Sequence, residues 1–302
     1  MSDVSAIAIQ SQEGDRALRE GDPVQQRVAW RRRLRRLPAL LGAVWLAAVV
    51  FVAIFAPLLP LHNPSEITNF FSLSPFSKWS EPLGTDALGR SVLSRVAFGA
   101  RVSLSVSVGG AIIAMLVGGT IGVLVGYFRG IAEHLFEVFA NSLLAFPPLV
   151  LLIIITTALR PSVFSLILAL AATSIPSFAR ISRATTLSLR NREYVTASRA
   201  LGSRHLRIIG RELIPSVLLA LLPYSIVIVS VLIVAEGSLS FLGLGVPPPT
   251  PSWGGMIADG RDSLIDSPFL VFVPGGVLFL TVLSLNLVGD WARTRFQRES
   301  AL

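Results

Sequence analysis

Apolar residues gather in six long blocks along the chain, and polar or charged segments separate these blocks. Each block is about 20 residues or longer and nearly free of charge, which suits an α-helix that crosses the roughly 30 Å hydrocarbon core of a bilayer. The pattern therefore predicts an all-α membrane protein with six transmembrane helices. The expected spans are residues 38–59, 102–127, 135–159, 161–179, 215–234 and 269–288.

Two of these spans carry residues that modify a helix. Pro147 and Pro148 lie within the third span, and they are expected to kink or break it because proline lacks a backbone N–H and clashes with the preceding turn. The second span contains Gly118, Gly122 and Gly126, whose four-residue spacing places them on one helix face. We predict that this glycine ladder packs closely against a neighbouring helix.

The distribution of basic residues predicts which segments face the cytoplasm. If the amino terminus lies inside, 20 of the 26 Lys and Arg residues fall in inner segments and six fall in outer ones. Cytoplasmic loops carry an excess of Lys and Arg, so both termini are expected in the cytoplasm. The chain then divides into a tail at 1–37, a transmembrane domain at 38–290 and a second tail at 291–302.

The outer segments with the most sequence pattern are expected at residues 60–101 and 240–268. Between Val92 and Val102, apolar residues recur near helical spacing and are interrupted by arginines. This pattern predicts a short helix that lies at the membrane interface and leads into the second span.

Composition excludes several functions. The chain is 52% hydrophobic and only 15% charged, whereas a soluble domain is about a quarter charged. It has no cysteine, and its single lysine, Lys78, lies in Ser-Lys-Trp, so a phosphate-binding loop of the G-x-x-x-x-G-K-[ST] type is impossible. The net charge of +8 comes from connecting loops without interleaved aromatic residues, which favours topology over nucleic-acid binding. We expect no cofactor to bind this chain.

The inner loop expected at residues 180–215 carries eight arginines. Its sequence predicts a helix over 193–201, a break at Gly202 and a second helix that ends at Leu213. In the second helix, apolar residues fall on one face and arginines on the opposite face, which predicts that it lies along the membrane surface. The apolar positions are Leu206, Ile209 and Leu213, and the basic ones are Arg204, Arg207 and Arg211.

The first helix of this loop offers small side chains that suit close docking into a groove of another protein. They are Thr196, Ala197, Ser198 and Ala200. Pro215 suits the first turn of the fifth span. The alternative interpretation is a solvated, lipid-facing loop without a partner.

Residues for other chemistries are sparse. A secondary carrier or channel needs ionisable groups at mid-membrane depth, but Glu137, Glu236 and Asp290 fall near the expected span ends, where interfacial or packing roles are favoured. The three histidines lie in three different loops, and no H-E-x-x-H or G-x-S-x-G motif is present. An enzyme active site is therefore not expected.

The inner loop resembles the cytoplasmic coupling loop of ABC-importer permease subunits, whose motif is Glu-Ala-Ala, three residues, Gly, nine residues and Ile-x-Leu-Pro. Ala197 matches, and the spacing from Gly202 to Pro215 is kept. The chain departs from the motif at four positions, one of which is the conservative Ile214 in place of leucine. Thr196 replaces the glutamate, Ser198 the second alanine and Glu212 the isoleucine.

The flanking segments resemble the dipeptide/oligopeptide/nickel group of these permeases. Residues 83–104 resemble the segment before its second span, Glu193-Tyr194-Val195 its version of the loop, 240–262 its last outer loop and 286–293 its C-terminal end. The shorter first outer loop resembles that of the C-type subunit. The resemblance covers residues 38–298. Its outer-loop motif residues are Gly84, Thr85, Asp86, Gly89, Arg90, Gly243, Gly245, Trp253 and Gly254.

The resemblance implies a type I ABC-importer permease fold in a bacterial inner membrane, with a cytoplasmic coupling helix. It implies a non-catalytic half of a translocation pathway for di- or oligopeptides. The implied partners are a second permease, two ATPase subunits or one fused ATPase that bind ATP and Mg²⁺, an extracytoplasmic binding protein, and membrane lipid, with no nucleic acid. The residues implied to couple to the ATPase are Glu193, Tyr194, Thr196, Ala197, Ser198, Ala200, Leu201, Gly202 and Pro215.

The cargo stays open at this point. Nickel capture favours His, Cys or Met along the path, yet the spans hold no His or Cys and only one Met, Met115. Peptide is therefore preferred, with glutathione or another peptide-like solute as an alternative.

Overall fold

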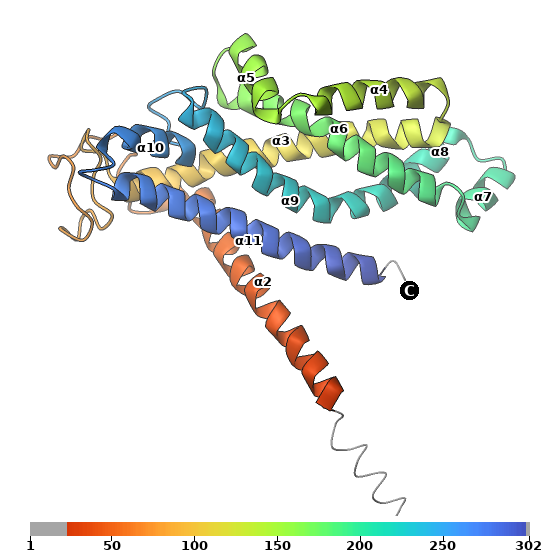
Figure 1. The fold of residues 1–302 in the computed structure, drawn as a ribbon, viewed down its shortest axis with the longest axis horizontal. Coiled ribbons are helices and arrows are strands. Elements are labelled where there is room, and N and C mark those ends of the chain that lie inside the picture. The colour runs from red at the N-terminus through yellow and green to blue at the C-terminus, as the bar shows by residue number, and fades with distance from the viewer. Residues whose placement is uncertain (1–22, 300–302) are drawn as a thin grey trace, which may run out of the picture. The chain divides into compact units, whose positions relative to one another are not determined.

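The computed structural model describes residues 23–299, and the side-chain environments of 37–295. Within these ranges the chain is helical, with isolated β-bridges in the first outer loop and no named strand (Figure 1). The α-helices are α2 (Pro23–Phe55), α3 (Val92–Phe128), α4 (Ile131–Ala145), α5 (Pro148–Ala158), α6 (Val163–Leu189), α7 (Glu193–Ala200), α8 (His205–Ile208), α9 (Ile214–Phe241), α10 (Trp253–Gly260) and α11 (Phe269–Glu299). The described chain divides into two units between residues 41 and 42, and the contacts described below lie within the second.

Five helical stretches in the described part of the chain are long and apolar enough to cross a membrane. They are Leu37–Leu58, Val92–Phe128, Val163–Leu189, His205–Phe241 and Phe269–Arg295. A bent pair, α4 with α5, makes a sixth if the pair counts as one broken span. This count agrees with the six predicted spans, although four of the helices extend well beyond the predicted limits.

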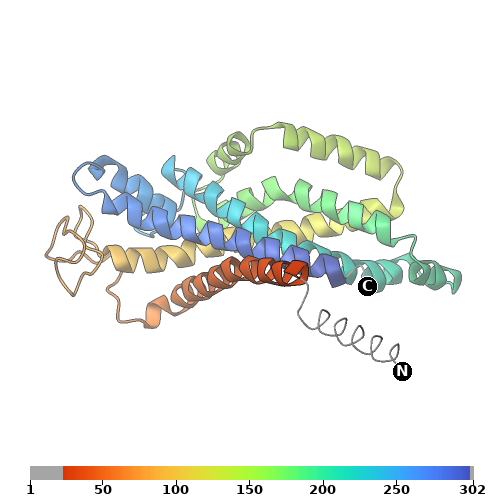
Figure 2. The same cartoon turned by 60° about the horizontal axis from the view of Figure 1, so that its bottom comes forward.

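The break between α4 and α5 lies at the two prolines. α4 ends at Ala145, α5 begins at Pro148, and the two helix axes differ by 94°. Figure 2 shows α5 turned away from the direction of α4. Proline is tolerated at the first position of a helix because no intrahelical partner is lost there. The predicted break is confirmed.

α3 and α6 pack together closely along the glycine ladder. A methyl group on Gly118 would lie 2.6 Å from the carbonyl oxygen of Ile175, and one on Gly126 would lie 3.0 Å from that of Arg183. Between them, a methyl group on Gly122 would overlap the carbonyl oxygen of Ala179. The three glycines therefore face the backbone of α6, and this contact is available only without a Cβ atom.

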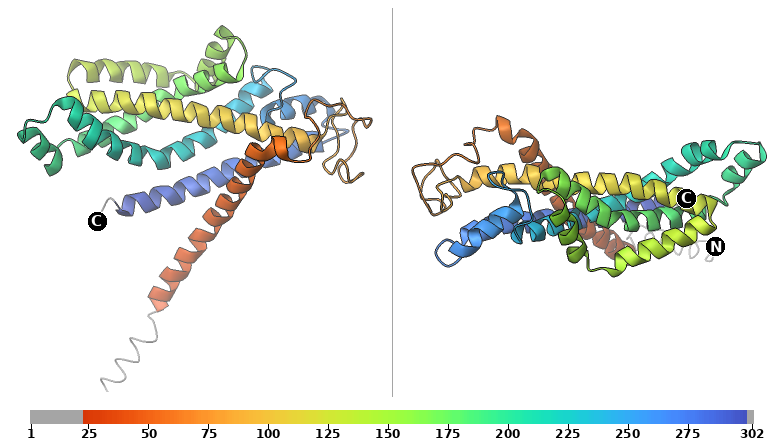
Figure 3. Two further views of the ribbon diagram at one scale, coloured as in Figure 1. Left: turned by 180° about the vertical axis from the view of Figure 1, so that it is seen from behind. Right: turned by 90° about the horizontal axis from the view of Figure 1, so that it is seen from above.

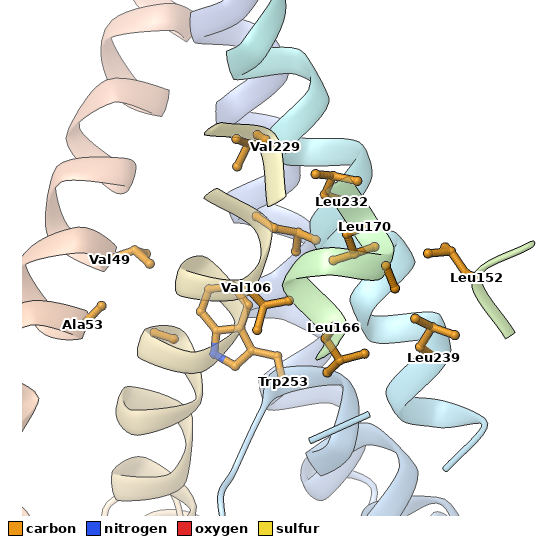
Figure 4. Close-up of a cluster of buried hydrophobic side chains, with 14 residues drawn as sticks. Val49, Ala53, Val106, Leu152, Leu166, Leu170, Val229, Leu232, Leu239 and Trp253 are labelled. Atoms are coloured by element: carbon orange, nitrogen blue, oxygen red, sulfur yellow. The ribbon is translucent and has the colours of Figure 1, made fainter. Parts of the chain in front are cut away.

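The half of the bundle that contains α10 is built around Trp253, the first residue of this helix. Trp253 is fully buried among side chains of α3, α6 and α9 (Figure 4). Its indole N–H donates to the carbonyl oxygen of Val96 at 3.0 Å, and its backbone N–H donates to Ser103 Oγ at 3.2 Å. α10 is thereby held between α3 and α9. At Gly254, a methyl group would lie 2.5 Å from Gly237 Cα of α9.

Glu236 lies inside this half of the bundle. Its side chain is fully buried, and it accepts hydrogen bonds from Ser240 at 2.7 Å and from Ser103 at 3.0 Å. A buried carboxylate needs such donors because desolvation otherwise penalises it strongly. Of the two roles favoured by the sequence, the structure supports packing.

The predicted interfacial helix before the second span is wrong. Residues 92–102 are the first turns of α3, which continues without a break to Phe128. Val92 and Val96 are buried against Met256 and Leu270. The apolar stripe packs against α10 and α11, which a local pattern cannot distinguish from packing against lipid.

Candidate functional site

α7 and the turn at Gly202 form a short helical hairpin tip with α8. Gly202 has φ +77°, a conformation that side chains other than glycine adopt at a cost. Its N–H donates to the carbonyl oxygen of Arg199, and the N–H of Ser203 donates to that of Ser198. This pair of hydrogen bonds is the Schellman arrangement that terminates a helix. The predicted helix end and break are therefore confirmed.

The face of α7 that points away from the bundle is not covered by any described part of the chain. Six of the residues implied to couple to an ATPase are exposed in α7 and its C-cap, and Ser198 is half-buried. Leu201 at the tip is 87% exposed. The six exposed residues are Glu193, Tyr194, Thr196, Ala197, Ala200 and Leu201.

Two further residues complete this predicted set. Gly202 is exposed, and a methyl group on it would meet nothing within 4 Å. Pro215 is exposed in the first turn of α9, as expected, but it lies 13 residues along the chain from Gly202 and is no part of the α7 surface. The structure thus groups α7 with Gly202 and separates Pro215 from them.

The face of α7 that packs on the bundle is anchored by Val195, for which the sequence predicted no role in packing. Val195 is fully buried in a cluster with Tyr127 of α3 and Ile208 of α8. The signal was available, because Val195 is the only β-branched aliphatic residue in an otherwise polar or small helix. One face of α7 is thus fixed to the bundle, while the opposite face is free.

The second predicted helix of the loop is not separate from the fifth span. α8 passes through a π turn, Ile209–Leu213, directly into α9, so His205–Phe241 is one unbroken helical stretch. Leu206 is 79% exposed, whereas Ile208, Ile209 and Leu213 are buried. Arg204, Arg207 and Arg211 are exposed, so the predicted basic positions and two of the three predicted apolar ones lie as expected, and Leu206 is the exception.

The outer-loop motif residues gather at the opposite end of the bundle from α7 (Figure 3). Thr85 is fully buried; its hydroxyl donates to the carbonyl oxygen of Phe70 at 2.7 Å, and Gly84 and Gly89 have positive φ angles of +78° and +77°. Gly243, at φ +78°, ends α9, and Gly245 packs against Ser240. These residues shape the loops around the buried Trp253.

An ionic network joins the first outer loop to α3 and α10. Arg90 Nε lies 2.7 Å from Asp86 Oδ2, and Arg95 Nη2 lies 3.1 Å from Asp259 Oδ2. Arg95 is 5% exposed and also lies 3.7 Å from Asp86. From the sequence, Arg95 was expected as an outer charge and as one of the arginines that interrupt the apolar stripe, because its partners are distant along the chain. A hollow of about 420 Å³ opens beside this network.

A second ionic cluster joins α4 to α6 near the α7 end. Arg183 forms ion pairs with Glu133 and, at 2.8 Å, with Glu137. One turn along α6, Arg180 donates to Asn141 at 2.8 Å. Both arginines lie on α6, so Arg180 and Arg183 belong to the end of this long helix and not to the loop between helices. Among the described residues, no group of three or more His, Cys, Asp or Glu side chains is placed to hold a metal ion.

Comparison with known proteins agrees with this architecture. The family described as "Binding-protein-dependent transport system inner membrane component" matches residues 118–300, and "N-terminal TM domain of oligopeptide transport permease C" matches residues 25–75. The chain is 37% identical over 270 residues to the di/tripeptide transport system permease protein DppC of Pseudomonas aeruginosa, which covers 87% of this chain and 89% of that protein.

A second relative and a solved structure extend the comparison. The chain is 32% identical over 264 residues to the glutathione transport system permease protein GsiD of Pectobacterium atrosepticum, covering 87% of this chain and 88% of that protein. A chain from inward-facing structures of the MetNI methionine ABC transporter superposes with a TM-score of 0.56 and 16% identity, covering 67% of this chain and 96% of that chain, and so shares the fold. This chain belongs to the family of binding-protein-dependent transport system inner membrane components, and it is a multi-pass permease subunit of an ABC importer in the bacterial inner membrane.

Proposed function

We propose that this chain forms one half of the translocation pathway of an ATP-driven importer of di- and oligopeptides. A second, homologous permease completes the pathway, and a binding protein delivers the cargo from outside. Two ATPase subunits, or one fused ATPase, lie beneath the permeases and bind ATP and Mg²⁺. This chain catalyses no reaction and receives work through α7, whose end of the bundle faces the cytoplasm together with both termini.

The exposed surface of α7 is the observation that carries this proposal. Its side chains are mostly small, and Leu201 adds an apolar tip that is 87% exposed. The inner face is fixed by the fully buried Val195, so the exposed face is presented in one orientation. A short helix with this surface fits an apolar groove of a partner protein, and burial of Leu201 there removes apolar area from water.

Peptide is the cargo that the relatives support. One relative is named as a di/tripeptide permease and another as a glutathione permease, and glutathione is itself a tripeptide. We favour di- and oligopeptides because the chain is more similar to the di/tripeptide permease, at 37% identity, than to the glutathione permease, at 32%.

Co-purification followed by transport tests the proposal. The chain, carrying an affinity tag, is isolated from its native membrane in mild detergent, and the accompanying subunits are identified and reconstituted into vesicles with the binding protein. We expect ATPase subunits and a second permease to co-purify, and a labelled tripeptide to accumulate only with ATP. Isolation of the chain alone, or uptake without ATP, would contradict the proposal; accumulation of glutathione in preference to tripeptides would correct the cargo.

A further inference from the structure

Tyr127, the penultimate residue of α3, contacts three separate parts of the segment between α6 and α9. Its hydroxyl lies 2.8 Å from Nδ1 of His205, the first residue of α8. The guanidinium of Arg199, near the end of α7, lies over its ring at 5.7 Å from the centroid. Arg190, which caps α6, donates to its carbonyl oxygen at 3.4 Å. One residue of α3 therefore contacts the segment at three points, Arg190, Arg199 and His205.

The surroundings of Tyr127 make this junction well defined. Tyr127 is 7% exposed and lies in one apolar cluster with Val195 and Ile208. The ring of His205 packs edge-on against Tyr127, at 5.7 Å between centroids, and also contacts Phe128 at 6.1 Å. A hydrogen bond at the edge of an apolar cluster is stronger than one in open water, because less solvent competes for the donor and acceptor.

α3 is suited to carry a displacement from this junction to the other end of the bundle. It is 37 residues long, about 55 Å at 1.5 Å per residue, and it contains no proline. Along its inner half the glycine ladder fixes it to α6. Near its outer end, Val96 and Ser103 hold the buried Trp253 of α10 through two hydrogen bonds.

We infer that Tyr127 is the positioning residue that makes α3 follow α7, through the bond between its hydroxyl and His205. The inference rests on the proposed docking of α7 to an ATPase. When the ATPase moves α7 and α8, the bonded pair moves the end of α3 with them. Without the bond, the segment slides over the end of α3, so ATP is hydrolysed without opening the outer side of the pathway.

The test measures coupling, which a purely structural role of Tyr127 would leave unchanged. The complete importer is reconstituted with its binding protein, and ATP hydrolysed per tripeptide imported is measured for Tyr127→Phe, His205→Ala and the double variant. His205→Asn places an amide group near the position of Nδ1 and serves as the conservative variant. His134→Ala is the matched control, because His134 is exposed at the same end and has no side-chain hydrogen bond in the described chain.

We expect Tyr127→Phe and His205→Ala each to raise the ATP consumed per tripeptide about fivefold, the effect of losing one hydrogen bond. The double variant is expected to be no worse than either single variant, because both remove the same bond. His205→Asn and His134→Ala are expected to keep the wild-type ratio. His205→Ala keeps the inference testable if Tyr127→Phe fails to assemble.

Three outcomes would separate failure of this inference from failure of the proposed function. Docking is checked separately by a cross-link from the thiol of an Ala200→Cys variant to an ATPase. An unchanged ratio in both single variants, with this cross-link still formed, would overturn the role of Tyr127 alone. Additive losses in the double variant would overturn it as well. Absence of that cross-link in the otherwise wild-type importer would overturn the proposed docking, whatever the ratio.

Discussion

Gly122→Ala is expected to destabilise the importer by about 3 kcal/mol, the upper part of the range for overpacking a close contact. The new methyl group would overlap the carbonyl oxygen of Ala179 and lie 2.6 Å from Ser182 Cβ, and the nearest of these atoms belongs to a helix backbone that cannot rotate away. α3 and α6 must then separate, which also lengthens the hydrogen bond that Ser182 donates to the carbonyl oxygen of Gly119.

The measurement is the midpoint of thermal unfolding of the chain, purified in mild detergent with the subunits that accompany it. Gly275→Ala is the matched control, because the same methyl group would there meet nothing within 4 Å. Alanine favours a helix over glycine, so the control midpoint should be equal to the wild type or slightly higher. Equal midpoints for the two variants would show that the ladder is not a close helix contact.

Ala197→Trp is expected to reduce ATP-dependent uptake about 30-fold, while the chain still inserts and assembles with the second permease. Ala197 is exposed on α7, so a large side chain there clashes with nothing in this chain but prevents close seating in a groove. Disruption of a central interface residue costs about 2 kcal/mol or more, which corresponds to a loss of that size.

The measurement is tripeptide uptake together with the amount of ATPase that co-purifies. Ala132→Trp is the control, because Ala132 is also an exposed alanine of a helix at this end of the bundle but belongs to α4. Uptake at the wild-type rate by Ala197→Trp would remove α7 from the coupling site. An equal loss in Ala132→Trp would show that bulk anywhere at this end is harmful.

Features that depend on neighbouring residues along the chain could be predicted. The broken span at Pro147 and Pro148 follows from the chemistry of proline, and the helix end at Gly202 follows from its freedom to adopt positive φ. The four-residue spacing of the glycines also indicated a packing face, although not that α6 would be the partner. Each of these predictions needed only local geometry.

Features that depend on distant parts of the chain could not be predicted. Glu236 lies near the end of an apolar block. Only the packing of α3 against α9 shows that its carboxylate is buried and accepts hydrogen bonds from Ser103 and Ser240. Arg95 resembles any outer arginine until α10 brings Asp259 to it. Leu206, predicted to share an apolar face with Ile209 and Leu213, is exposed beside the π turn before α9, where a constant period of 3.6 residues does not hold.

One departure from the coupling motif, at Thr196, is explained by the contacts of α7. Thr196 occupies the position where the motif has glutamate, and its hydroxyl donates to the carbonyl oxygen of Arg192 within the same helix. It therefore makes no hydrogen bond to the bundle, and α7 is held by Val195 beneath it. In this chain α7 is held by the buried Val195 and by Arg199, whose guanidinium lies over the ring of Tyr127, and the exposed face is free to fit a partner.

The most direct test of the account is a cross-link from α7 to an ATPase. The chain has no cysteine, so Ala200→Cys introduces a unique thiol on the exposed face of α7. A short thiol–amine reagent is applied to the assembled importer in inside-out vesicles and, separately, to intact cells with a membrane-impermeant form. The account predicts a cross-link to an ATPase subunit in the inside-out vesicles and no reaction in intact cells; reaction from the outside, or no ATPase product from the inside, would contradict it.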